Sequence, residues 1–191
     1  MQLVPRPLRP AVFLDRDGVL NAVELSVGRP LPPASVERFS LLPRVPEACR
    51  LLRAAGYFLV VVTNQPDLAR GLQTAETIEE MHAALARAVQ VDDIRVCPHD
   101  DADNCTCRKP KPGLLLSAAS EHYLDLGRSY MVGDRWRDVE AGRRAGCRTV
   151  LLYSDYDERH PERPDKVVDT LFDAAQWILS RDTSREGGTS G

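Results

Sequence analysis

The sequence contains no apolar run close to the roughly 20 residues that a membrane-spanning helix needs, so we expect no membrane partner. It also has no marked excess of positive charge, since its formal net charge is −3 over 191 residues. No segment interleaves aromatic with basic residues as a nucleic-acid groove does, and we expect no nucleic-acid partner. Residues 1–10 include arginines but lack the apolar segment of a signal peptide. We therefore expect a cytoplasmic protein.

The chain is long enough for one domain with a buried core, and its pattern alternates strands with helices. Strands are predicted over 11–14, 57–62, 94–97, 129–132 and 149–153, and helices over 46–55, 74–89, 113–123, 138–145 and 170–180. This alternation predicts an α/β fold, a three-layer Rossmann-like sandwich around a mostly parallel central sheet. We predict a single domain over residues 1–180 and a disordered tail over 181–191, which lacks apolar residues.

Two carboxylates follow the first predicted strand directly. Asp15 and Asp17 come after the apolar run 11–14, and Gly18 permits a turn that lets both face one site. Chemistry in an open α/β sheet sits at the carboxyl ends of the strands. One carboxylate could therefore attack a substrate while the other handles protons, with a hard cation between them.

Further polar groups follow other predicted strands or precede a helix. They are Thr63, Asn64, Gln65, Arg108, Lys109, Asp134 and Asp138. A strand-end aspartate on its own is more often a helix cap than a catalytic group, and for Asp138 a cap and a supporting role at a metal site stay equally open. The set as a whole supplies what phosphoryl transfer needs, namely a nucleophile, a proton donor, a hard cation and donors for the phosphoryl oxygens.

The segments DRDGVLN, TNQ, RKPKPG and VGDRWRD resemble, in this order, the four motifs of the haloacid dehalogenase superfamily of aspartate-nucleophile phosphatases. The resemblance implies that Asp15 attacks phosphorus to form an aspartyl-phosphate, and that Asp17 protonates the leaving oxygen and then activates water. It also implies that Thr63 hydrogen-bonds the phosphoryl group and that Lys109 holds Asp15 and a phosphate oxygen. Asp134 would bind Mg2+ together with the Asp15 carboxylate and the Asp17 backbone carbonyl.

Three of the five cysteines crowd around one histidine in a Cys-x-His…Cys-x-Cys array. Its members are Cys97, His99, Cys105 and Cys107. Three thiolates and an imidazole suit a closed, structural Zn2+ site in a reducing compartment; buried or redox-active cysteines are the alternative. The array ends directly before Arg108 and Lys109, so folding around Zn2+ would fix where these two cations point.

This zinc loop, residues 97–107, narrows the resemblance to one branch of the superfamily. That branch holds the D-glycero-D-manno-heptose-1,7-bisphosphate 7-phosphatases and the histidinol-phosphate phosphatases. The segments KPGLL and VVVTNQP look more like the heptose enzymes, so the resemblance implies removal of the 7-phosphate from a small phosphorylated sugar, with histidinol phosphate as the alternative substrate. It also implies substrate contacts by Asn64, Gln65, Arg108 and Arg135.

The segment 21–42 departs from the heptose-enzyme pattern. Its prolines and turn residues predict an irregular flap, which lacks that branch's Gly-Tyr turn and carries Arg29. Arg29 is either a second phosphate anchor or a solvated turn residue. Because no large insertion separates the motifs, we expect a capless enzyme. The resemblance to small phosphatases of this kind implies a monomer. The rival from another class is a zinc-stabilised binding module that has lost catalysis, although such a module would not need the whole motif set.

Overall fold

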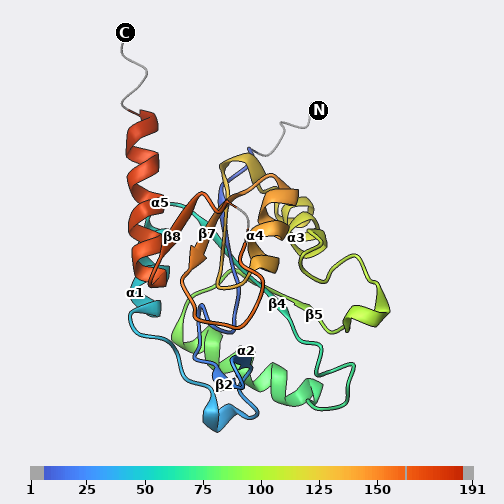
Figure 1. Cartoon of the computed structure of the whole chain (residues 1–191). Coiled ribbons are helices and arrows are strands. Elements are labelled where there is room, and N and C mark those ends of the chain that lie inside the picture. The colour runs from blue at the N-terminus through green and yellow to red at the C-terminus, as the bar shows by residue number, and fades with distance from the viewer. Residues whose placement is uncertain (1–6, 162, 187–191) are drawn as a thin grey trace, which may run out of the picture.

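Six parallel strands form the central sheet. The structure, a computed structural model, describes residues 7–161 and 163–186. The sheet has the order β5-β4-β1-β6-β7-β8, with every neighbouring pair parallel. Its strands are β1 (Ala11–Leu14), β4 (Phe58–Asn64), β5 (Asp93–Cys97), β6 (Tyr130–Gly133), β7 (Arg148–Leu152) and β8 (Lys166–Val168). The predicted α/β, Rossmann-like class is therefore confirmed (Figure 1).

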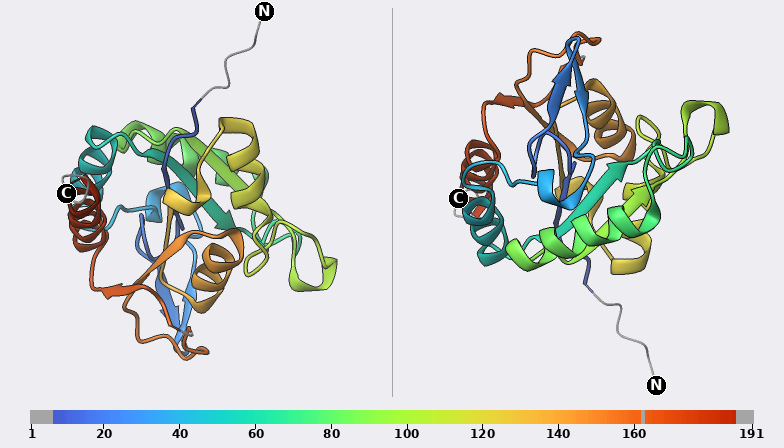
Figure 2. Two further views of the ribbon diagram at one scale, coloured as in Figure 1. Left: turned by 90° about the horizontal axis from the view of Figure 1, so that it is seen from above. Right: turned by 90° about the horizontal axis from the view of Figure 1, so that it is seen from below.

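Helices cover both faces of this sheet (Figure 2). α1 (Val45–Ala54), α2 (Ala75–Ala88) and α5 (Leu171–Glu186) pack on one face, and α3 (Gly113–His122) and α4 (Trp136–Ala145) pack on the other. The side chains of β1 alternate between the two layers, because successive residues of a strand point to opposite faces. Val12 and Leu14 join the first core, whereas Ala11 and Phe13 join the second. All four are buried, which explains the continuous apolar run in the sequence.

Strand β1 lies near the middle of the sheet. From β1 the chain proceeds to β4 and β5 on one side, and β6, β7 and β8 then extend the sheet on the other side. The carboxyl ends of β1 and β6 therefore mark the topological switch point, where open α/β sheets bind ligands. Asp15 directly follows β1, and Asp134 directly follows β6.

The segment 21–42, expected to be an irregular flap, contains a regular hairpin. β2 (Glu24–Ser26) and β3 (Arg29–Leu31) pair antiparallel around a turn formed by Val27 and Gly28. Both turn residues have positive φ, 49° and 72°, as a two-residue hairpin turn requires. Valine is rare in this conformation, so the segment lacks the usual hairpin signal. Only this hairpin and a 3-10 turn, η1 (Val36–Arg38), lie between β1 and α1, so the described chain carries no cap domain at this position.

Two further elements differ from the prediction near the C-terminus. The short strand β8 was not predicted, and α5 continues to Glu186, so residues 181–186 of the predicted disordered tail are helical. The rest of that tail, 187–191, lies outside the described residues. None of the helices that the structure describes is long and apolar enough to cross a membrane.

Candidate active site

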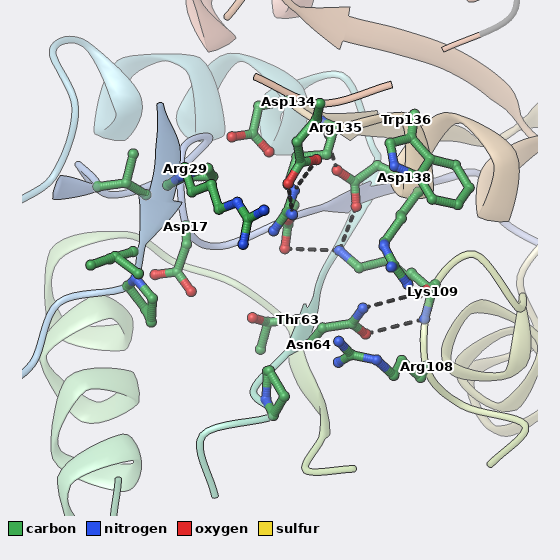
Figure 3. Close-up of a pocket in the computed structure, with 18 of the residues that line it drawn as sticks. Asp17, Arg29, Thr63, Asn64, Arg108, Lys109, Asp134, Arg135, Trp136 and Asp138 are labelled. Carbon is green, nitrogen blue, oxygen red and sulfur yellow. Dashed lines mark hydrogen bonds and ion pairs between the residues drawn. The ribbon is translucent and has the colours of Figure 1, made fainter. Parts of the chain in front are cut away.

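A cavity of about 550 Å3 opens at the carboxyl ends of the strands, within the usual range for small-molecule sites. Its walls come from the turn after β1, the end of β4, the segment around 101–109, the start of α4, the β2–β3 hairpin and the loop after β7. Figure 3 shows Asp17, Thr63, Lys109 and Asp134 around this cavity, contributed by segments far apart in the sequence.

Lys109 forms the charged centre of the site. Its Nζ lies 2.8 Å from Asp15 Oδ1 and 2.6 Å from Asp138 Oδ1, and it donates to the Val62 carbonyl at 2.8 Å. The side chain of Lys109 is only 2% exposed. Burial acts to lower the pKa of Lys109, but the negative charges of Asp138 and Asp15 outweigh it, so the pKa is raised. The lysine is therefore a permanent cation between two carboxylates.

Asp138 contacts both the start of a helix and the charged centre of the site. Its Oδ2 accepts a hydrogen bond from the Arg135 backbone amide at 3.1 Å, as a residue in the first turn of a helix does in a capping box. Its Oδ1 binds Lys109. The helix-start and site roles thus belong to different oxygens of one buried carboxylate.

Asp134 carries an unsatisfied oxygen that points to a cation. Its Oδ2 accepts from the Tyr156 hydroxyl at 2.8 Å, whereas its Oδ1 is buried without a hydrogen-bond partner among the described residues. Carboxylate oxygens of Asp15, Asp134 and Asp138 lie within 4.8 Å of one another. Burial, followed by the charges of Asp15 and Asp138, raises the pKa of Asp134 well above its usual value. Buried carboxylates that outnumber their cations fit a hard divalent ion such as Mg2+.

Glycines at two motif positions make room for this cluster. A Cβ on Gly18 would lie 1.9 Å from Asp134 Oδ2, and Gly18 has a positive φ of 85°. A Cβ on Gly133 would lie 2.1 Å from the Cβ of Asp138. Any side chain at either position would displace a carboxylate, which explains both DRDG and VGD in physical terms.

Asp17 lies across the cavity from Lys109 and is held by several donors (Figure 3). Arg16 donates to both carboxylate oxygens of Asp17, at 3.1 and 2.9 Å, and the Asn21 and Gln65 amides donate at 2.9 and 2.8 Å. The fully buried Arg16 also contacts His82 Nε2 at 3.2 Å. Burial and the Arg16 charge lower the pKa of His82 to about 4, so a neutral imidazole faces the guanidinium.

The TNQ segment supports the site largely from behind. The Asn64 side chain pairs with the backbone of Lys109, accepting from its N–H and donating to its carbonyl, both at 3.1 Å. Gln65 is buried and donates to Thr63 Oγ1 and Asp17 Oδ2, both at 2.8 Å. Thr63 and Asn64 line the cavity, but Gln65 is not among its lining residues. Gln65 was predicted to contact the substrate, but it lies behind Thr63 and Asp17, away from the cavity surface.

The Cys/His cluster is assembled as the sequence predicts. The three sulfurs lie 3.2–3.7 Å apart, and His99 Nδ1 lies 3.3 Å from Cys107 Sγ and 3.7 Å from Cys97 Sγ. A tetrahedral zinc site with bonds of about 2.3 Å to sulfur separates its ligands by similar distances, so the donor set and its spacing fit Zn2+. Arg108 follows the cluster and donates to the His99 carbonyl at 3.1 Å and to Asp101 at 2.8 Å.

The loop after β7 contributes three consecutive residues that sequence analysis missed. The Tyr156 hydroxyl donates to Asp134, and the Asp157 amide donates to the Gly28 carbonyl at 2.9 Å. The two carboxylate oxygens of Glu158 accept from Nε and Nη2 of Arg135. No local motif marks this loop, because its residues acquire their partners only through the fold.

The match to known proteins agrees with this architecture. Residues 106–174 match the HAD-hydrolase-like family model. This match agrees with the parallel sheet and with the buried cluster of Asp15, Lys109 and Asp138 at its switch point. Together with the full-length relatives of this chain, it shows the class: a phosphatase of the haloacid dehalogenase superfamily.

Full-length relatives define the family. The chain is 37% identical to the D-glycero-D-manno-heptose-1,7-bisphosphate 7-phosphatase of Thermosynechococcus vestitus, covering 90% of this chain and 96% of that protein. It is 40% identical to the D-glycero-beta-D-manno-heptose-1,7-bisphosphate 7-phosphatase of Yersinia pestis, with 90% of each covered. The crystal structure of the D,D-heptose 1,7-bisphosphate phosphatase from B. bronchiseptica, complexed with magnesium and phosphate, superposes with a TM-score of 0.75 at 34% identity, covering 90% of this chain and 99% of that one. The chain belongs to the same family of phosphatases as these enzymes.

Proposed function

We propose that this phosphatase removes the 7-phosphate of D-glycero-D-manno-heptose 1,7-bisphosphate through an aspartyl-phosphate intermediate. The observation that carries the reaction type is the buried group of Asp15, Lys109 and Asp138 beside the unpartnered Asp134 oxygen. The names of the relatives support the substrate.

The first step would transfer the phosphoryl group to Asp15. An Asp15 carboxylate oxygen forms a bond to phosphorus, the bond from phosphorus to the sugar oxygen breaks, and a proton from Asp17 passes to that oxygen. In the second step water attacks phosphorus, Asp17 takes its proton, and the bond to Asp15 breaks. Thr63 and Lys109 would donate to the phosphoryl oxygens as charge develops. Gln65 and Asn21 keep the Asp17 carboxylate in a fixed orientation by donating to it.

The proposed metal ligands are Asp15, Asp134 and the Asp17 backbone carbonyl. Mg2+ bound there would offset the repulsion between these carboxylates and an anionic phosphate. Asp134 is preorganised for this role, because the Tyr156 hydroxyl donates to one of its oxygens and no described residue donates to the other.

We propose Zn2+ as a structural ion bound by the Cys/His cluster. All four of its positions would be occupied by protein, which leaves none for a substrate. The loop that it closes carries Arg108 and Lys109 to the cavity wall. Asn64, Arg108 and Arg135 line the cavity and are proposed substrate contacts, whereas Gln65 is proposed to position Thr63 and Asp17. We also propose a monomer in a reducing compartment, which suits the free cysteines.

A substrate panel tests this proposal. Both anomers of the heptose bisphosphate, histidinol phosphate and p-nitrophenyl phosphate are assayed with Mg2+ by phosphate release. We expect hydrolysis of a heptose bisphosphate to be the most efficient, and we expect Asp15→Asn to release no phosphate. A preference for histidinol phosphate would reassign the substrate, and no hydrolysis of any ester would favour a binding module.

A further inference from the structure

Arg29 differs from the other arginines that line the cavity. Four of these form ion pairs with carboxylates of the same wall, namely Arg70, Arg108, Arg135 and Arg137. Arg159 lies over the Trp136 ring, 5.1 Å from its centroid. The side chain of Arg29 has neither a hydrogen bond nor an ion pair with any residue that the structure describes, although its backbone belongs to the β2–β3 ladder. Its guanidinium therefore offers all five donors to a ligand.

The backbone beneath Arg29 is fixed in place. The residue directly follows the hairpin turn, and the Asp157 amide donates to the carbonyl of Gly28 at 2.9 Å. The flanking residues of Asp157, Tyr156 and Glu158, bind the Asp134 and Arg135 side chains. The loop 156–158 thus contacts both the hairpin and the segment that carries Asp134 and Arg135. Arg29 is therefore held relative to the reacting groups, although its side chain is exposed.

The side chain is also aimed at the ligand space. Figure 3 shows the Arg29 guanidinium pointing from the hairpin into the cavity, on the same side as Asp17. The reacting end has its own cation in Lys109, which is occupied by Asp15 and Asp138. A guanidinium fork matches two phosphate oxygens with parallel hydrogen bonds. The cavity volume of about 550 Å3 leaves room for a sugar that carries a second phosphate.

We propose that Arg29 is a specificity-determining residue that binds the phosphate that does not react. This inference rests on the proposed phosphatase function and assigns the hairpin a part in it. Arg29 would favour substrates with two anionic groups, because a monophosphate bound at Asp15 leaves the Arg29 guanidinium without a partner. In this proposal Arg29 acts in substrate binding and not in the chemical step.

The test compares one bisphosphate with the matching monophosphate. D-glycero-β-D-manno-heptose 1,7-bisphosphate and the corresponding heptose 7-phosphate are hydrolysed by wild type, Arg29→Gln and Arg29→Lys. We expect Arg29→Gln to lower kcat/KM for the bisphosphate by about tenfold, mainly through KM, because a hydrogen-bonded charge pair is lost. The monophosphate should change by less than about twofold. Arg29→Lys should recover part of the loss, since it keeps the charge but not the fork.

Arg38→Gln is the matched control. Arg38 is an exposed arginine of the same flap that pairs with Glu24 and does not line the cavity. The Arg38→Gln variant loses the same charge as Arg29→Gln, but its kcat/KM should stay unchanged for both substrates. Equal losses for the two substrates, or no loss for the bisphosphate, would overturn the role of Arg29. Failure of the wild type to hydrolyse either heptose phosphate would instead count against the proposed function.

Discussion

Replacing Asp15 with Asn is expected to abolish turnover and also to stabilise the protein when Mg2+ is absent. The variant keeps the shape of the side chain, whose oxygen can still accept from the Arg16 amide and the Lys109 ammonium, both 2.8 Å away. It removes a negative charge that is buried beside the carboxylates of Asp134 and Asp138. Burial, followed by the charge of Asp138, raises the pKa of Asp15 to about 6.

The sign of the effect follows from the direction of this shift. A carboxyl with a raised pKa in the folded protein binds its proton more tightly there than in the unfolded chain. The folded state therefore loses stability as the pH rises from about 4 through about 6. A rise in the pKa of Asp15 from 3.8 to about 6 corresponds to about 3 kcal/mol. Above pH 7 the Asp15→Asn variant can be more stable than the wild type by at most this free energy, which corresponds to roughly 6–12 °C in Tm for a chain of this size.

The assay is thermal unfolding followed by circular dichroism in Mg2+-depleted buffer, with the zinc content verified. We expect a higher Tm for Asp15→Asn than for the wild type at pH 7.5, and a smaller difference at pH 4. Added Mg2+ should stabilise the wild type more than the variant. Glu79→Gln, which neutralises an exposed carboxylate on α2, is the control and should change little. A variant no more stable than the wild type at pH 7.5, or a gain that is equal at both pH values, would refute the reasoning.

Three further predictions concern Gly18, which makes room for the Asp134 carboxylate, the TNQ segment and the Cys/His cluster. Gly18→Ala should lower the free energy of unfolding, measured in urea, by more than Gly56→Ala does, because both glycines have positive φ but only Gly18 lies against Asp134. Equal losses of stability would contradict the close packing of Gly18 against this carboxylate. Gln65→Ala should lower kcat by about tenfold with little change in KM, since it positions catalytic groups without lining the cavity; a change confined to KM would indicate substrate contact instead. Removing zinc should lower activity even with saturating Mg2+, because the loop before Lys109 loosens; unchanged kinetics in verified zinc-free protein would contradict the coupling.

Sequence reasoning succeeded where a feature depends on near neighbours along the chain. The run before Asp15 is apolar at every position because both faces of β1 are covered, and the strand was predicted with its observed bounds. The positions of Lys109 and Asp134 in their motifs were enough to expect them at one site, and both line the cavity. The β2–β3 hairpin was missed because Val27 adopts a conformation that its residue type disfavours.

The features that sequence reasoning missed depend on contacts between residues far apart in the chain. Gln65 adjoins two cavity-lining residues in the sequence, yet its side chain turns into the interior and binds Thr63 and Asp17. Tyr156 and Glu158 lie in a loop without a motif, and they reach the site because β7 ends beside β6.

The sequence by itself determined the main alternation of strands and helices, because local periodicity encodes it, and its four motifs indicated the reaction class through their resemblance to a known superfamily. Only the tertiary structure decided that one Asp138 carboxylate serves both Lys109 and the start of α4. It alone decided that, among the described residues, an Asp134 oxygen finds no hydrogen-bond partner and the Arg29 side chain faces the cavity without one. These outcomes depend on which side chains from distant segments compete for the same buried space, and packing alone settles that competition.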